Sequence, residues 1–224
     1  MKVLILDSGI LINFSLNGLL DLLEKLKESF DGKFLITNYV KQEVIDRPER
    51  IEKFELSALK VRDLLDRKVI ELPNSLGISE SELNQETMHL MDIANHYLQS
   101  SNGWVKLVSE AEMSCLALSD QLSKKGIENM IAIDERTTRI LAEKPENLER
   151  MMSERLKQRI SLVAEDLNVF RKYRFIRSSE LVFVCHKKDL FPIKSKNALE
   201  ALLFATKAHG SSVSFEEINE LKKL

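Results

Sequence analysis

The chain of 224 residues is poor in the residues that make tight turns, since it contains only 7 Gly and 4 Pro. Together these are about 5% of the chain, against roughly 12% in an average protein, so we expect many helices. Cysteine is scarce as well. Cys115 and Cys185 lie far apart in sequence in apolar surroundings and form no Cys-x-x-Cys pair. We therefore predict two buried, reduced thiols and no structural zinc site.

Long apolar runs and a bulk basic charge are also missing. The apolar run Val3 to Leu6 ends at Asp7, and no segment approaches the roughly 18 uncharged residues of a membrane helix. This pattern predicts a cytoplasmic protein without a membrane partner. The 33 Lys and Arg residues are balanced by 35 Asp and Glu residues, so the net charge of −2 gives no sign of nucleic-acid binding.

The charges are, however, unevenly distributed along the chain. Residues 151–224 hold 14 Lys and Arg against 9 Asp and Glu, whereas residues 1–150 carry 19 against 26. The basic part contains the run 171–177, in which cations alternate with two aromatic residues. Such a run suits contacts to phosphates and to an unpaired base, although the end of a solvated helix is an equally simple interpretation. The predicted RNA-binding residues are Arg171, Lys172, Tyr173, Arg174 and Arg177.

What is present along the first 145 residues is an alternation of apolar runs with amphipathic segments. We predict strands at 3–6, 33–37, 69–72 and 130–133. Helical spacing of apolar residues predicts helices at 10–26, 39–46, 48–66, 79–100, 110–125 and 135–142. Strands that alternate with helices indicate an α/β fold with a parallel central sheet. In this interpretation Trp104 anchors a loop to the core.

After Pro145 the alternation stops, and helical spacing dominates. We predict helices at 151–170 and 197–209 and another that starts at Ser214, with a single strand-like run at 181–185. The sequence therefore predicts two units, an α/β domain at 1–147 and a helical C-terminal extension at 148–224.

Acidic residues follow two of the predicted strands. Asp7 ends the first strand, and Asp134 with Glu135 follows the fourth. Ligands of parallel α/β proteins gather at the carboxyl ends of the strands, where Glu43 and Glu112 on neighbouring helices could join these acids. Clustered carboxylates repel one another, and a divalent cation such as Mg²⁺ or Mn²⁺ removes that cost.

Each acid also has a simple structural interpretation. Asp7 could cap a helix, and Glu112 lies three residues after Ser109, as in a capping box. Glu110 could complement a helix dipole, and Glu43 could be an ordinary exposed helix residue.

Four segments, taken in order, resemble the motifs of the PIN-domain family. They are residues 4–13 (LILDSGILIN), 36–44 (ITNYVKQEV), 109–118 (SEAEMSCLAL) and 131–139 (IAIDERTTR). The resemblance covers about residues 1–145 and is greatest to prokaryotic PIN proteins. It implies a three-layer α/β/α sandwich and a Mg²⁺- or Mn²⁺-dependent endoribonuclease. It also raises the expectation of a toxin of the VapBC type with an antitoxin protein as partner, and of a homodimer.

The resemblance assigns catalytic roles to Asp7, Glu43, Glu112 and Asp134, with Glu110 and Glu135 as further metal ligands. Ser109 stands where these relatives have Gly, and Glu135 where Asp is common, so the fourth acid can be Asp134 or Glu135. Two functions are expected from this pattern. The first is metal-assisted hydrolysis of RNA, in which a cation lowers the pKa of a bound water. The alternative is a PIN-like module that binds RNA or protein with weak or no catalysis.

Overall fold

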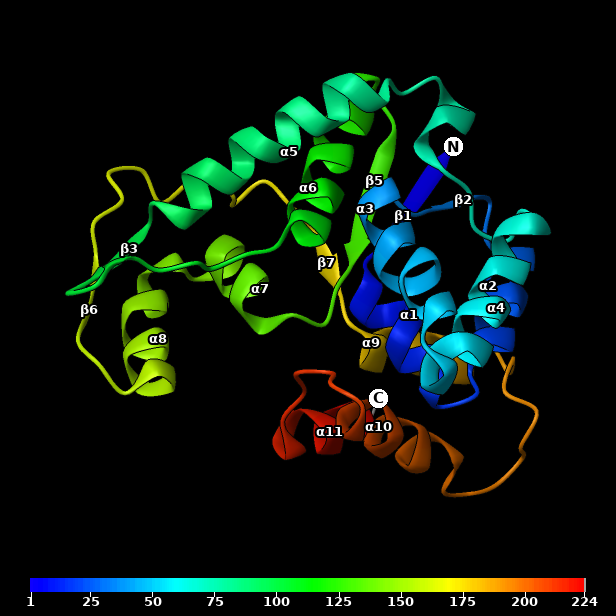
Figure 1. Ribbon diagram of the computed structural model, residues 1–224. Coiled ribbons are helices and arrows are strands. Elements are labelled where there is room, and N and C mark those ends of the chain that lie inside the picture. The colour runs from blue at the N-terminus through cyan, green and yellow to red at the C-terminus, as the bar shows by residue number, and fades with distance from the viewer. Residues whose placement is uncertain (224) are drawn as a thin grey trace.

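The computed structural model describes residues 1–223; residue 224, the last of the predicted extension, lies outside the described residues (Figure 1). Its strands are β1 (Lys2–Leu6), β2 (Gly32–Leu35), β3 (Leu98–Ser100), β4 (Gly103–Trp104), β5 (Glu128–Ala132), β6 (Ile160–Leu162) and β7 (Phe175–Ile176). Its α-helices are α1 (Ser8–Leu16), α2 (Leu20–Glu28), α3 (Asn38–Lys41), α4 (Glu52–Asp66), α5 (Glu80–Asn95), α6 (Glu110–Lys124), α7 (Arg136–Glu143), α8 (Leu148–Leu156), α9 (Ser178–Lys187), α10 (Ala198–Ala208) and α11 (Phe215–Leu221). A π-helical turn, η1 (Gln42–Asp46), and three 3₁₀ turns, η2 (Pro48–Arg50), η3 (Pro73–Leu76) and η4 (Pro145–Asn147), complete the elements.

Four parallel strands form the main sheet, in the order β2-β1-β5-β7. The central strand β1 is apolar and buried from Val3 to Leu6, as expected for a strand covered on both faces. The predicted α/β class with a parallel sheet is therefore confirmed. The predicted strand at 69–72 is reduced to one parallel bridge, between Leu35 and Glu71, because only this residue reaches the edge of β2.

The register of the sheet aligns the carboxyl ends of three strands. Leu6 of β1 lies opposite Ala132 of β5, which in turn lies opposite Ile176 of β7. The amide of Asp7 donates to the carbonyl of Ala132 at 3.0 Å and so continues the ladder by one residue. Residues that follow β1, β5 and β7 therefore meet at one edge of the sheet.

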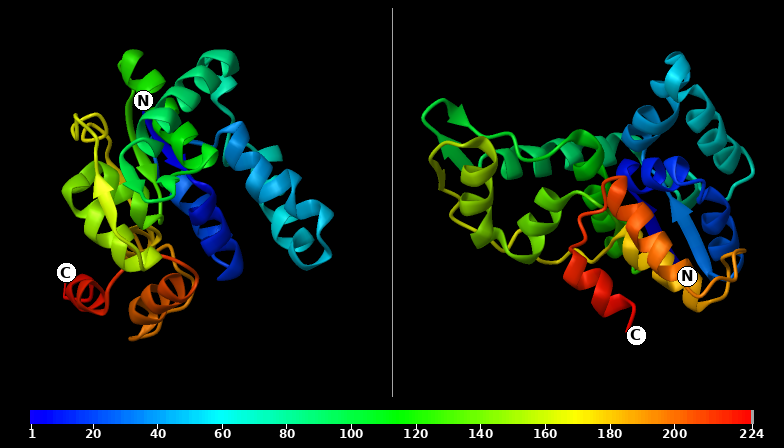
Figure 2. Two further views of the ribbon diagram at one scale, coloured as in Figure 1. Left: turned by 60° about the vertical axis from the view of Figure 1, so that its left-hand side comes forward. Right: turned by 90° about the horizontal axis from the view of Figure 1, so that it is seen from below.

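A second, antiparallel sheet has the order β4-β3-β6 and stands apart from the first. Figures 1 and 2 show it with α8 in a lobe at one end of the molecule, joined to the body by the long helix α5. We call β3, β4, α8 and β6 the lobe. The predicted helix at 151–170 is correct only as far as residue 156. Lys157 after α8 adopts the left-handed conformation (φ 54°), and the chain returns as β6. The predicted helix at 79–100 likewise ends early, and its last residues form β3.

The predicted C-terminal extension contributes to the main sheet. Its residues Phe175 and Ile176 form β7, which pairs with β5, and α9 and α10 pack on each other beside α1 and α2. The strand-like run 181–185 is wrong as a strand, because it lies inside α9 with Leu181, Val182 and Cys185 buried on one face. Helix α11 starts as predicted, because Ser214 and Glu217 form a capping box at its N-terminus.

Both cysteines are free and buried, as predicted. Among residues 1–223, no helix is long and apolar enough to cross a membrane.

Candidate active site at the carboxyl edge of the parallel sheet

Asp7 is a buried carboxylate between the end of β1 and the start of α1. It is only 3% exposed and serves as the N-cap of α1, where Oδ2 accepts a hydrogen bond from the amide of Gly9 at 3.2 Å. The other carboxylate oxygen, Oδ1, is buried, and no group in the described part of the chain donates a hydrogen bond to it. A buried carboxylate oxygen without a partner is costly, so this atom is the feature of the site that most requires a ligand. The helix-cap interpretation of Asp7 thus accounts for only one of its two oxygens.

The electrostatic environment of Asp7 identifies its acidic neighbours. Burial, followed by repulsion from Glu112 and a smaller one from Glu43, raises the pKa of Asp7 to about 7. The same three carboxylates, after burial, raise the pKa of the buried Cys115 thiol. Glu43 and Glu112 are therefore both near enough to repel Asp7, and all three carboxylates act on the Cys115 thiol of α6.

Glu43 approaches Asp7 from the π-helical turn η1, which continues α3. Its side chain is half-buried and also borders an apolar groove between α1 and α4. Thr37 starts α3 by accepting a hydrogen bond from the amide of Val40, and its hydroxyl bonds that of Ser114 on α6. This contact holds α3 and η1 beside α6. Glu43 is therefore not an ordinary exposed helix residue.

Glu112 lies in the first turn of α6 and is held by two hydroxyl groups. Ser109 donates to Oε1 at 2.9 Å and Thr138 of α7 donates to Oε2 at 2.5 Å. Burial raises the pKa of Glu112 and repulsion from Glu135 adds to this, while the two hydroxyl donors oppose the shift. The predicted cap is present, because Ser109 caps α6. It does not exclude a role in the site, because Glu112 also repels Asp7.

Asp134 is buried beside Asp7 and is held by Ser178, the first residue of α9. A Cβ atom built on Gly9 would lie 3.3 Å from Asp7 Oδ2 and 3.9 Å from Asp134 Cβ. Both oxygens of Asp134 accept hydrogen bonds from Ser178, Oδ1 from its amide at 3.0 Å and Oδ2 from its hydroxyl at 2.5 Å. Ser178 follows β7, so the C-terminal segment completes this edge of the sheet.

The two acids whose roles were open in the sequence differ in position. Glu135 is half-buried, caps α7 through the amide of Thr137 and borders the same groove as Glu112. Glu110 is exposed at the start of α6, which favours Glu112 over Glu110 as the site residue. Asp134 lies near Asp7, and Glu135 borders the same groove as Glu112. Both candidates for the fourth acid therefore lie at the site.

The carboxylates approach one another without forming a closed metal cage. Within residues 1–223, no three His, Cys, Asp or Glu side chains are grouped closely enough to hold a metal ion. Mg²⁺, however, is commonly bound through one or two carboxylates and several waters rather than by an all-protein cage. The unpartnered Oδ1 of Asp7, next to Glu112, fits this kind of binding.

Ser178 and Thr138 are the residues of this site that sequence reasoning missed. Each is a hydroxyl that orients one carboxylate, and orienting partners of this type tune ligand groups. The signal for Ser178 was weak, because β7 is only two residues long. Thr138 lies inside the fourth motif, but its bond to Glu112 joins two segments 26 residues apart, so no local signal predicted it.

The predicted RNA-binding run 171–177 is largely engaged in internal contacts. Tyr173 is buried, and its hydroxyl donates to the Asp120 carboxylate at 2.8 Å. The same carboxylate forms an ion pair with Lys172. Arg177 is buried and pairs with Glu180 and Glu217 at 2.8 and 2.7 Å. Arg171 pairs with Glu146 at 3.4 Å, and Arg174 is exposed. The run therefore attaches the C-terminal segment to the body, and burial leaves little of the Tyr173 ring for a base to stack on.

Comparison with protein-family models, with curated proteins and with solved structures finds no match to this chain.

Proposed function

We propose that this protein is a metal-dependent endoribonuclease that hydrolyses RNA phosphodiester bonds at the carboxylates around Asp7. The observation that carries the proposal is the buried Oδ1 atom of Asp7, which accepts no hydrogen bond from residues 1–223 although Oδ2 and the backbone around it are satisfied. A divalent cation would fill this position and lower the repulsion among Asp7, Glu43 and Glu112.

The four motif segments support the same proposal. Asp7 and Asp134 follow β1 and β5, Glu43 lies in η1 and Glu112 in α6, and both Glu43 and Glu112 repel Asp7, which supports one shared site. We therefore propose a PIN-type, three-layer α/β/α arrangement for the body of the molecule. Catalytic residues contributed by several strand ends are the rule in parallel α/β enzymes.

Each residue has a defined role in this proposal. Asp7 would hold Mg²⁺ or Mn²⁺ through Oδ1, with Glu112 or Glu43 as the second carboxylate. The cation, when bound, supplies a water of lowered pKa and stabilises the leaving oxygen. Asp134, held by Ser178, would lie beside the cation held by Asp7, while Thr138 and Ser109 orient Glu112 toward the site.

A weakly active or inactive RNA- or protein-binding module is the alternative, and one observation favours it. Asp134 gives both oxygens to Ser178 and Glu112 gives one oxygen to each of two hydroxyls, so fewer carboxylate lone pairs face a cation than the motif order implies.

Cleavage of a labelled RNA in Mn²⁺ tests the proposal. We expect cleavage by the natural protein, and a loss of at least about a hundredfold in Asp7→Asn and Asp134→Asn, because charge stabilisation at the reacting phosphate depends on these groups. Asp31→Asn, an exposed Asp outside the site, is the matched control and should cleave normally. Equal cleavage by all four proteins would mean a contaminating nuclease and would contradict the proposal.

Metal binding is measured separately by thermal unfolding. A ligand that binds only the folded state raises the melting temperature, so Mn²⁺ should stabilise the natural protein and Asp31→Asn but not Asp7→Asn. Stabilisation without cleavage would select the inactive module instead.

A further inference from the structure

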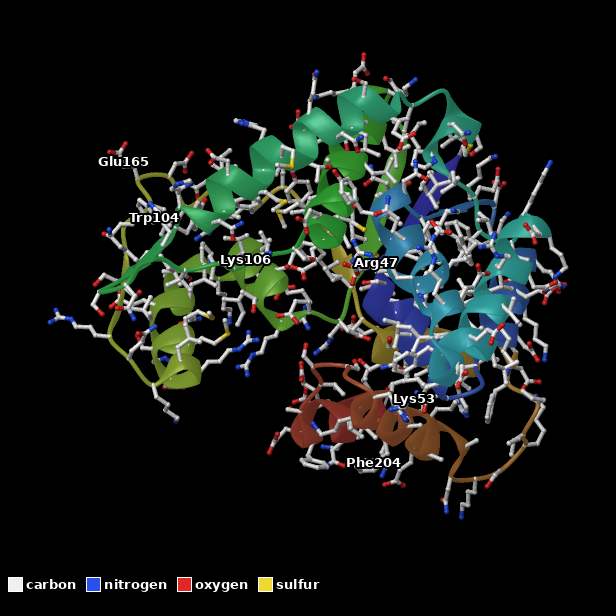
Figure 3. The ribbon with its side chains drawn as sticks, in the orientation of Figure 1. Arg47, Lys53, Trp104, Lys106, Glu165 and Phe204 are labelled. Atoms are coloured by element: carbon white, nitrogen blue, oxygen red, sulfur yellow. The ribbon has the colours of Figure 1, made fainter. Side chains whose placement is uncertain are left out.

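The lobe and the body enclose a groove that ends at two of the site carboxylates. It has a volume of about 590 Å³ and is bordered by the chain from β4 to α6 on one side and by α8 on the other. Glu112 and Glu135 lie at its inner end. Figure 3 shows Trp104 at the outer part of the lobe and Lys106 between it and the central helices.

Trp104 presents an exposed aromatic surface in this groove. It is 52% exposed, so the predicted role as a core anchor is wrong. Its ring is nevertheless oriented, because His96 at the end of α5 packs edge-on against it with ring centroids 4.7 Å apart. An exposed but oriented indole is the type of side chain on which an unpaired base stacks.

Two cations border the same groove. Lys106 and Arg155 are both exposed, and within residues 1–223 neither forms an ion pair with an acidic side chain. Arg155 donates a long hydrogen bond of 3.4 Å to the hydroxyl of Thr137. Other cations, such as Lys172 and Arg177, are held in ion pairs, whereas Lys106 and Arg155 are available for an external anion.

We infer that this groove binds single-stranded RNA, with one base stacked on Trp104 and backbone phosphates held by Lys106 and Arg155, and directs the strand to Glu112 and Glu135. The inference rests on the proposed function for the identity of the polymer. A duplex does not fit the arrangement, because its bases are stacked on one another and offer no free face to an indole. The alternation of one aromatic with two cations likewise distinguishes RNA from a purely acidic peptide, which has phosphate-like charge but no base.

The chain offers a direct probe, because Trp104 is its one tryptophan. Titration of metal-free protein in EDTA with a short oligouridylate should quench the tryptophan fluorescence in a saturable, salt-dependent way. The same oligouridylate in a duplex with oligoadenylate, and polyglutamate, should quench it far less. Equal quenching by the duplex or by polyglutamate, or no quenching at all, would overturn the inference.

Variants test the individual contacts through the anisotropy of a fluorescein-labelled oligouridylate. Lys106→Ala and Arg155→Ala should each weaken binding several-fold and reduce the slope of log affinity against log salt by about 0.7. Trp104→Ala should weaken binding roughly tenfold or more, and Trp104→Phe should restore most of it. Arg150→Ala is the matched control, since Arg150 is an exposed cation on the same helix that does not border the groove.

The outcomes separate this inference from the proposed function. RNA cleavage that persists while Lys106→Ala, Arg155→Ala and Trp104→Ala all bind like Arg150→Ala would overturn the groove and leave the nuclease intact. Binding that depends on these residues, without cleavage in Mn²⁺, would support the groove and contradict the nuclease.

Discussion

At the scale of single residues, Asp7 combines a structural and a chemical task in one side chain. Oδ2 caps α1, which fixes the carboxylate in place, and Oδ1 is left buried without a donor from residues 1–223. Such an arrangement costs stability in the absence of a ligand, because desolvation disfavours the charged form. The stability of the metal-free protein should therefore depend on the ionisation of Asp7.

In EDTA, we expect the natural protein to lose stability as the pH rises through the range in which Asp7 ionises. The ordinary pKa of the side chain is 3.8, and burial raises it to about 7. Between these values the folded state binds more protons than the unfolded chain, so stability is full below about pH 4 and falls until about pH 7. A shift of this size corresponds to about 4 kcal/mol as an order of magnitude.

Urea denaturation of Asp7→Asn measures this cost, because asparagine keeps the cap and carries no charge. The variant should gain stability relative to the natural protein above pH 7, by up to a few kcal/mol, and should show little gain near pH 4. Asp31→Asn should differ from the natural protein by the same small amount at both pH values. A gain for Asp7→Asn that does not change with pH would contradict the raised pKa of Asp7.

Ser178 and Ser179 form a natural pair for a second test. Ser178→Ala removes the hydroxyl that donates to buried Asp134, and we expect it to lower the free energy of unfolding by about 1–3 kcal/mol. Ser179→Ala removes a buried hydroxyl that has no hydrogen-bond partner in the described chain, so it should be nearly neutral. Thermal or urea unfolding compares them, and equal losses would mean that the bond to Asp134 contributes nothing specific.

At the scale of secondary-structure elements, the C-terminal helices are joined to one another through Arg177. This residue precedes α9, bonds Glu180 in the first turn of that helix, and bonds Glu217 of α11. Its backbone amide also donates to the Glu180 carboxylate at 2.8 Å, so Glu180 satisfies this amide at the start of α9. One side chain therefore fixes the start of α9 and its distance from α11.

Replacement of Arg177 should destabilise the protein rather than impair RNA binding. Arg177→Ala leaves two carboxylates without their partner, and we expect a loss of about 2 kcal/mol after allowance for the partial exposure of Glu180 and Glu217. Arg174→Ala, an exposed cation three residues earlier, should stay within about 0.5 kcal/mol of the natural protein. Chemical denaturation and RNA titration of both variants check the prediction. If Arg177→Ala bound RNA more weakly with unchanged stability, the prediction would be wrong and Arg177 would be an RNA-binding residue.

At the scale of the whole molecule, the parallel sheet is built from both parts of the chain. The strand β7 closes the edge of β5, and Ser178 after it holds Asp134. The lobe is also composite, because β3 of the first part pairs with β6 of the second. Stability is therefore expected to be shared over residues 1–223 rather than divided at residue 147.

A fragment of residues 1–147 tests this view. Without β7 and β6, it exposes the edges of β5 and β3 and loses the apolar cover provided by Leu181, Val182 and Cys185. We expect no cooperative thermal transition by circular dichroism and ready aggregation, whereas the full chain should melt in a single transition. A sharp transition of the fragment near the melting temperature of the full chain would establish an independent domain at 1–147.

Local patterns in the sequence were sufficient for much of the body. The apolar run that ends at Asp7, the cap at Ser109 and the left-handed Gly126 after α6 are set by neighbouring residues, so β1, α6 and β5 lie where the sequence predicts them. Local patterns failed where pairing over long distances decides the structure. The run 181–185 has β-branched residues typical of a strand, yet burial of one helical face against the body makes it part of α9.

The sequence by itself determined the parallel α/β class and the acids that stand at strand ends and helix starts, because strand burial, helix periodicity and capping depend on residues close together in the chain. Only the tertiary structure decided that Ser178 holds Asp134, that Tyr173 and Arg177 are buried and bonded to acidic side chains, and that Trp104 borders a groove. Those facts depend on contacts between segments far apart in sequence, and such contacts leave no periodic signal in either segment. The small net charge of −2 illustrates the same division, since composition fixes the sum and the fold decides which cations remain unpaired.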